Sequence, residues 1–141
     1  MQNASLMITY RLGNDLDLDA IIDLYRASTL GERRPVDDRE RMALMLRNAN
    51  LVLTAWDNDQ LVGIARSMSD FSFATYLSDL AVRLSYQKQG IGRELIRRTQ
   101  EASGEATVVL LSAPKAVDYY PRIGMKSHPS AWTLSHDQHL G

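Results

Sequence analysis

The first fifty residues show two kinds of hydrophobic spacing. Apolar and polar residues alternate over residues 7–12, which predicts a short strand. Residues 17–30 repeat apolar side chains at helical spacing and predict a helix that buries Leu18, Ile21, Ile22, Tyr25 and Leu30. The pattern breaks at residues 31–35. Residues 37–48 then predict a second helix, whose apolar face is less regular.

From residue 50 the spacing becomes that of a sheet. Two apolar runs, residues 51–56 and 61–66, flank an Asp/Asn turn and predict a β-hairpin, and residues 74–84 predict a third strand. Residues 90–102 predict an amphipathic helix with Ile91, Leu95, Ile96 and Thr99 on its apolar face. The apolar run at residues 107–111 is typical of a strand covered on both faces. A strand, a helix and a strand in succession predict a parallel crossover.

The remaining chain predicts one more helix and one more strand. Ser112 is placed to cap a helix that has Pro114 in its first turn and ends at Gly124. Residues 125–134 are expected to form the last strand, and the polar tail at residues 135–141 is expected to fray. The order βααβββαβαβ predicts an α/β fold with a sheet of mixed direction, in a single domain over residues 1–141.

Composition limits the classes of function. With 45% apolar residues, 23% charged residues and a formal charge of -1, the chain is typical of a globular domain and not of a general nucleic-acid binder. It has no cysteine, which excludes disulfides, thiolate metal sites and an acyl-cysteine intermediate. The first ten residues lack the pattern of a signal peptide, and no apolar run is long enough to span a membrane. We therefore expect a cytoplasmic protein without membrane contact.

Acidic residues crowd the start of the first predicted helix. Carboxylates there suit the positive end of the helix dipole, which makes capping the preferred interpretation. A metal site is the alternative, but the spacing of a calcium loop is missing. These residues are Asp15, Asp17, Asp19 and Asp23.

Residues 87–92 form the strongest candidate for a ligand site. They connect a predicted strand directly to a helix, so several backbone amides at the helix start lack intrahelical partners and can bind phosphate. Gly90 and Gly92 would let an oxyanion approach the backbone, and Lys88, Arg93 and Arg83 would add positive charge. A tight turn with glycines for packing explains the spacing equally well. A P-loop is excluded because the chain has no Gly-Lys pair, and Leu95 replaces the third glycine of a dinucleotide fingerprint.

Two motifs at linked positions carry a resemblance to a known family. Leu80-Ala81-Val82 leading into Gln87-x-x-Gly90-x-Gly92 resembles motif A of the GCN5-related N-acetyltransferases (GNAT). Residues 116–125, Ala-Val-Asp-Tyr-Tyr-Pro-Arg-Ile-Gly-Met, look like a second segment of that family at the expected distance. The resemblance spans residues 51–134 and implies a GNAT fold that uses acetyl-CoA.

The same resemblance implies where the cofactor binds. The strand at residues 76–82 would carry a bulge and splay from residues 107–111, so that the pantetheine arm pairs with the strand edge as an extra strand would. No metal is required. The expected cofactor-binding residues are Leu80, Ala81, Val82, Gln87, Lys88, Gln89, Gly90, Ile91, Gly92, Arg93, Ser112, Tyr119, Tyr120 and Arg122.

Two side chains are candidates for proton transfer. Tyr120 aligns with the family tyrosine that protonates the departing thiolate, and a phenol stays protonated at neutral pH. Aromatic packing in the core is the alternative for Tyr120 and the preferred interpretation of Tyr119. Asp79 is the nearest carboxylate for a base, with water and a purely hydrogen-bonding role for Asp79 as alternatives. The chain departs from the family pattern at Ala113, where asparagine is frequent, and at Pro121, which follows the tyrosine inside the helix.

The resemblance therefore implies an acetyl-CoA-dependent N-acetyltransferase that acts on a primary amine of a small molecule by direct attack. A protein N-terminus or a lysine is left open as acceptor, and so is a homodimer. A non-catalytic acyl-CoA-binding domain of the same fold is the alternative, and a domain for some other phosphorylated ligand is a third. The acidic residues 15–23 and the Arg33-Arg34 pair lie where this family often builds its acceptor pocket. The identity of the acceptor amine is not readable from the sequence.

Overall fold

The computed structural model describes residues 7–141, which divide into two compact units. The first ends at Leu111, and the second covers Ser112–Gly141. None of the helices formed by residues 7–141 has the length and apolar character that a membrane span requires.

The first unit is built on a five-stranded sheet whose spatial order follows the chain. Its strands are β1 (Ile8–Leu12), β2 (Leu51–Asp57), β3 (Gln60–Ser69), β4 (Ala74–Val82) and β5 (Thr107–Val109). The first four pair antiparallel, whereas β5 pairs parallel to β4 after a helical crossover. The predicted mixed sheet is therefore confirmed.

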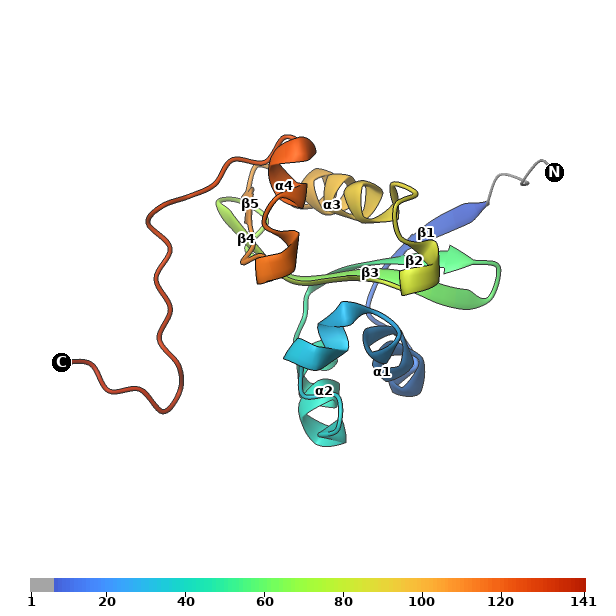
Figure 1. The fold of residues 1–141 in the computed structure, drawn as a ribbon, viewed down its shortest axis with the longest axis horizontal. Helices are drawn as coiled ribbons and strands as arrows, with labels where there is room; N and C mark the ends of the chain where they lie inside the picture. Colours follow the sequence, from blue (N-terminus) through green and yellow to red (C-terminus); the bar gives the residue numbers. More distant parts are fainter. Residues whose placement is uncertain (1–6) are drawn as a thin grey trace. The chain divides into compact units, whose positions relative to one another are not determined.

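Helices cover both faces of this sheet (Figure 1). The helices α1 (Leu18–Arg26) and α2 (Arg39–Arg47) lie on one face, and α3 (Ile91–Ala102) lies on the other. Between α1, α2 and the sheet lies a core of Ile21, Leu24, Tyr25, Met42, Leu46, Val52, Ile64 and Ala81. Against α3 the sheet approaches closely, because a Cβ on Gly63 would lie 3.1 Å from a Leu95 methyl.

Three of the four acidic residues at the start of α1 have structural partners. Asp17 is the N-cap and accepts a hydrogen bond from the Ala20 amide. Asp19 pairs with Arg39 of α2, and Asp23 pairs with Arg83 at 2.7 Å. The Asp17 contact agrees with the capping interpretation, and the two ion pairs connect α1 to its neighbours.

A bulge interrupts β4. Arg66 of β3 lies opposite Asp79, but the next residue, Ser67, lies opposite Leu77, so Ser78 is an extra residue on β4. An extra residue bends its strand and changes the direction of the following groups. The ladder from β4 to β5 includes only residues 74–76. The bulge and the separation of these two strands therefore agree with the expectation from the family.

The strand at residues 107–111 is shorter and more open than its apolar sequence predicted. β5 ends at Val109, and the side chains of Val109 and Leu111 are about half exposed, at 48% and 49%. The prediction of a strand covered on both faces was wrong. The bulge gives the physical reason, because β4 bends where the ladder to β5 stops.

The second unit contains two short helical segments, η3 (Pro114–Ala116) and α4 (Tyr119–Arg122). The single helix predicted from Ser112 is thus interrupted, and Ala113, not Ser112, precedes its first turn. Gly124 ends the helical part with φ of +100°. In the described residues 125–141 no strand forms, so the predicted strand at residues 125–134 was wrong. Pro129 removes a backbone donor from that segment.

Candidate functional site

In the second half of β4, some main-chain N–H and C=O groups point away from β3, toward the outer edge of the strand. The Arg83 amide donates to the Val62 carbonyl on β3 at 2.9 Å. Because alternate residues of an antiparallel strand direct their N–H and C=O groups to opposite edges, Leu80 and Val82 direct theirs to the outer edge. The Ser78 carbonyl also points away from β3, since it accepts a hydrogen bond from Arg34. β4 beyond residue 76 therefore offers an edge beside which an extended ligand can pair.

A short segment fixes the chain that follows β4. Arg83 donates to the Leu61 carbonyl and to Asp23, both at 2.7 Å, and the Leu84 amide donates to the Ala27 carbonyl at 2.9 Å. The Tyr86 hydroxyl donates to Asp57 at the end of β2. These contacts anchor the segment η2 (Leu84–Tyr86) at both ends. Arg83 therefore pairs with Asp23, and the expectation that its positive charge serves the loop at residues 87–92 is not met.

The loop at residues 87–90 turns β4 into α3. The Gln87 side chain donates to the Val82 carbonyl at 2.9 Å and so closes the loop on the strand. Lys88 and Gly90 both have positive φ, at 64° and 84°. The glycine prediction thus applies to Gly90, which precedes α3 in a left-handed conformation, whereas Gly92 lies inside the helix.

The start of α3 presents backbone donors. Its first intrahelical bond runs from the Glu94 amide to the Gly90 carbonyl at 3.0 Å, so the amides of residues 91–93 have no carbonyl one turn before them. Lys88, Gln89 and Arg93 have exposed side chains around this point, whereas the Ile91 side chain is buried and can offer only its backbone. Such an arrangement suits an anion.

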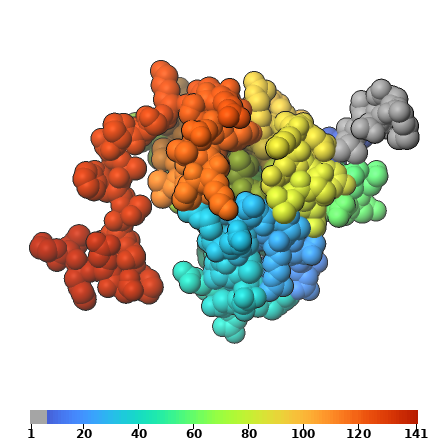
Figure 2. Space-filling view, in the orientation of Figure 1, coloured from blue at the N-terminus to red at the C-terminus, as the bar shows by residue number. Residues whose placement is uncertain are grey.

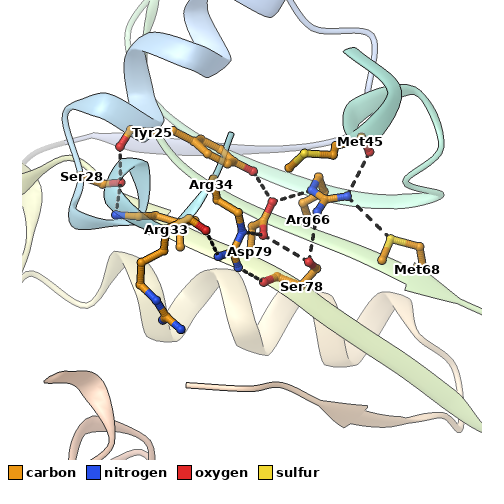
Figure 3. A network of polar contacts seen from close by, with 10 residues as sticks. Tyr25, Ser28, Arg33, Arg34, Met45, Arg66, Met68, Ser78 and Asp79 are labelled. Atoms are coloured by element: carbon orange, nitrogen blue, oxygen red, sulfur yellow. Dashed lines mark hydrogen bonds and ion pairs between the residues drawn. The ribbon is translucent and has the colours of Figure 1, made fainter. Parts of the chain in front are cut away.

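Asp79 follows the bulge residue Ser78, is fully buried, and lies at the centre of a polar network (Figure 3). Its two oxygens accept hydrogen bonds of 2.6 Å from the Tyr25 hydroxyl, from Nε of Arg34 and from Nε of Arg66. Ser78 donates a fourth bond at 3.2 Å. The side chain points toward α1 and its following loop, and it joins them to β3 and β4.

The network sets the protonation of its members. Burial raises the pKa of Asp79, but the hydrogen bond and charge of Arg66, with Tyr25 and Arg34, outweigh it and hold that pKa below its ordinary value. Burial, followed by the adjacent Asp79 carboxylate, raises the pKa of Tyr25 well above its ordinary value. A carboxylate with a lowered pKa and four donors is a poor proton acceptor. This geometry favours the hydrogen-bonding interpretation of Asp79.

In the second unit Tyr119 and Tyr120 pack edge to face, with ring centroids 5.2 Å apart. Burial, followed by Tyr119, raises the pKa of the Tyr120 hydroxyl. Pro121 is the third residue of α4, within the first turn, where a missing amide costs little. Ser112 is half-buried and Arg122 is exposed.

Comparison with known proteins identifies the family. A family model described as an acetyltransferase (GNAT) domain matches residues 30–132. The chain belongs to the GNAT acetyltransferase family. The resemblance seen in the two motifs is therefore confirmed.

Relatives of this GNAT domain agree in sequence and in fold. A Glycine max protein named a probable acetyltransferase is 28% identical over 137 residues, which include 86% of this chain and 53% of that protein. An uncharacterized N-acetyltransferase of Pyropia yezoensis is 25% identical over 120 residues, with 77% and 67% covered. A solved GNAT family acetyltransferase from Streptococcus pneumoniae is 27% identical, with a TM-score of 0.73 over 91% of this chain and 98% of that one. The chain spans about half the length of the first of these curated relatives.

Three residues of the GNAT domain's polar network were not singled out as site residues from the sequence. Tyr25 was taken for a core residue of a helix, and Arg66 was given no role in a site. Arg34 was noted only with Arg33, in the part of the chain where the family often builds its acceptor pocket. One signal could have found Arg66, because Arg66 and Asp79 are lone charges inside neighbouring apolar strands. A buried charge needs a partner, so two such charges of opposite sign predict a pair.

Proposed function

We propose that this GNAT domain binds acetyl-CoA and transfers its acetyl group to a primary amine of a small molecule. The observation that carries the proposal is the continuous path from the outward edge of β4 to the open amides of α3. Acetyl-CoA has a pantetheine arm with amide groups, and this arm is joined covalently to a pyrophosphate. Its two parts match the two ends of this path.

The cofactor would be held mainly by the backbone. The pantetheine amides pair with Leu80 and Val82, which direct their N–H and C=O groups outward. The pyrophosphate lies on the amides of residues 90–93, with Lys88 and Arg93 as cations. Gln87 holds the loop in the required turn through its bond to Val82. The remaining predicted contacts, those of Ser112, Tyr119 and Arg122, stay predictions.

The reaction we propose is direct transfer. A neutral amine attacks the thioester carbonyl, and outward N–H groups of β4 stabilise the oxyanion of the tetrahedral intermediate. Collapse of the intermediate breaks the carbon–sulfur bond, and Tyr120 donates its proton to the departing CoA thiolate. Water takes the proton lost by the amine, because the oxygens of Asp79 already accept four hydrogen bonds.

Calorimetry with acetyl-CoA and desulfo-CoA tests the binding step, and both ligands are expected to bind. Release of free thiol then tests transfer, with spermidine, kanamycin and a tripeptide with a free N-terminus as acceptors. We expect thiol release that depends on one of these amines. Absence of binding at high micromolar acetyl-CoA would end the proposal.

A non-catalytic acyl-CoA-binding domain is the second candidate. Ala113, at a position where the family often has asparagine, is the observation that favours it. The two candidates differ in one result, because a binder gives the calorimetric signal without amine-dependent thiol release. A cytoplasmic location and a homodimer stay predictions under either function.

A further inference from the structure

The segment that follows α1 runs beside the open half of β4. At one end the Ala27 carbonyl accepts a hydrogen bond from Leu84, and at the other Nη2 of Arg34 donates to the Ser78 carbonyl at 2.8 Å. The segment η1 (Thr29–Arg33) lies between these two contacts. In Figure 2 the yellow surface that carries η2 adjoins the blue surface of α1 and η1. The segment therefore accompanies β4 over the residues that no longer pair with β5.

Arg34 makes the contact that fixes the far end of this segment. Its Nε donates to Asp79 at 2.6 Å, its Nη2 to the Ser78 carbonyl on the bulge, and its Nη1 to the Arg33 carbonyl of its own segment at 2.8 Å. The planar guanidinium can hold strand and segment together because its donors diverge at fixed angles. Lysine cannot reproduce this set of contacts.

The anchor to which Arg34 binds is itself rigid. Asp79 is fully buried, and Tyr25 and Arg66 hold its second oxygen at 2.6 Å. Arg66 in turn donates to the Met45 carbonyl of α2 at 3.0 Å (Figure 3). Removal of Arg34 would leave Asp79 paired with Arg66. Loss of the Arg34 side chain should therefore free the segment that contains η1, while the domain stays folded.

We propose that Arg34 is a positioning residue that fixes η1 beside the open edge of β4 and so sets the place from which the acceptor amine reaches the thioester. This inference rests on the proposed function. An amine attacks productively only when it is held about 3–3.5 Å from the carbonyl carbon in the correct direction. A wall that borders the thioester determines that approach, while the backbone of β4 and the α3 amides still bind CoA.

Three variants test the inference: Arg34→Gln, Arg34→Lys and, as a matched control, Arg47→Gln. Arg47 is the exposed last residue of α2 and lies outside η1, so its loss removes the same charge without a change in the segment. With the best amine of the panel, Arg34→Gln should raise the KM for the amine about tenfold or more. The Kd for acetyl-CoA, from calorimetry, should stay within twofold. Arg34→Lys should recover part of the amine KM, and Arg47→Gln should match the wild-type protein.

Hydrogen exchange supplies a readout that is independent of activity. The amides of residues 29–34 should exchange at least tenfold faster in Arg34→Gln than in the wild-type protein and in Arg47→Gln. Unchanged exchange, or an amine KM that is unchanged in an active Arg34→Gln, would overturn the inference and leave the proposed function standing. A wild-type protein that releases no thiol with any of the amines would overturn the proposed function, and the positioning role with it.

Discussion

Asp79 brings together three parts of the chain that are far apart in sequence. It accepts hydrogen bonds from Tyr25 of α1, Arg34 of the following segment and Arg66 of β3. A buried carboxylate is tolerated only when donors replace its lost hydration, and here four donors do so. The same donors make proton uptake unfavourable. The four hydrogen bonds thus have two effects: they stabilise the fold next to the bulge, and they make Asp79 a poor base.

Replacement of this carboxylate tests that role. Asp79→Asn should lower the free energy of unfolding in urea by about 3–5 kcal/mol, because Arg66 is left as an unpaired buried cation. Asp59→Asn, on the exposed hairpin turn, should change it by less than about 0.5 kcal/mol. A stable Asp79→Asn protein with abolished turnover would instead assign the carboxylate to catalysis.

The pH dependence of this stability has a defined sign. The pKa of Asp79 is lower in the folded chain than its ordinary value of 3.8. Its contribution is therefore complete above that ordinary value and is lost as pH falls through the lower, folded pKa. The difference in unfolding free energy between the wild-type protein and Asp79→Asn should be constant from pH 7 to about pH 5 and shrink in more acidic buffer. Glu94, whose pKa is lowered to about 2 by Arg97, is present in both proteins and cancels in the difference.

The proposed acid gives a second prediction for a single side chain. Tyr120→Phe should lower kcat on the order of 10²-fold, since a general acid contributes about 10²–10⁴, and should leave the Kd for acetyl-CoA nearly unchanged. Tyr119→Phe is the matched control, because it removes the same hydroxyl from the adjacent ring. Steady-state thiol release and calorimetry separate the two effects. Equal kcat values for both variants would assign Tyr120 to packing.

At the scale of elements, the local hydrophobic pattern was sufficient to predict α3 and the hairpin of β2 and β3. The amphipathic spacing of Leu95, Ile96 and Thr99 predicted α3, which buries these residues against the sheet. The hairpin of β2 and β3 likewise followed from two apolar runs and a turn. Local pattern failed at residues 107–111 and 125–134, because pairing there depends on partners that are distant in the chain. The same limit hid the contacts of Tyr25, Arg34 and Arg66 with Asp79.

The bulge and the loop could be expected only in part. Nothing in the local spacing marks Ser78 as an extra residue, and the bulge was expected only from the family resemblance. Gly90 is different, since glycine is the residue that most readily adopts positive φ in a tight turn, and its φ is 84°. The sequence therefore indicated the loop of the candidate site from its residues. The open edge of β4 could not be predicted in the same way, because it depends on the register in which β4 pairs with β3 and β5.

The loop prediction can be tested with a matched pair of glycines. Gly90→Val should weaken acetyl-CoA binding about tenfold or more, because a side chain there strains the turn and obstructs the amides. Gly13→Val carries the same kind of backbone strain, since Gly13 has φ of 131° and open space around its Cα. Calorimetry should show normal affinity for Gly13→Val. Normal affinity for Gly90→Val would contradict the phosphate-loop proposal.

For the whole molecule, the two compact units divide the family's motifs between them. The edge of β4 and the loop before α3 belong to the unit that ends at Leu111, and Tyr120 belongs to the other. The family match at residues 30–132 crosses this division. We therefore expect the binding of acetyl-CoA to change the free energy of unfolding of the whole chain, which is measurable.

Binding to the folded chain alone must raise its stability. At a concentration one hundred times the Kd, acetyl-CoA should add about 2.7 kcal/mol to the free energy of unfolding. For a chain of 141 residues this is a rise in Tm on the order of 10 °C. Desulfo-CoA should give a similar rise, because it keeps the pantetheine amides and the pyrophosphate. Gly90→Val should lose most of the rise at the same ligand concentration, and a rise equal to that of the wild-type protein would place the pyrophosphate away from the α3 amides.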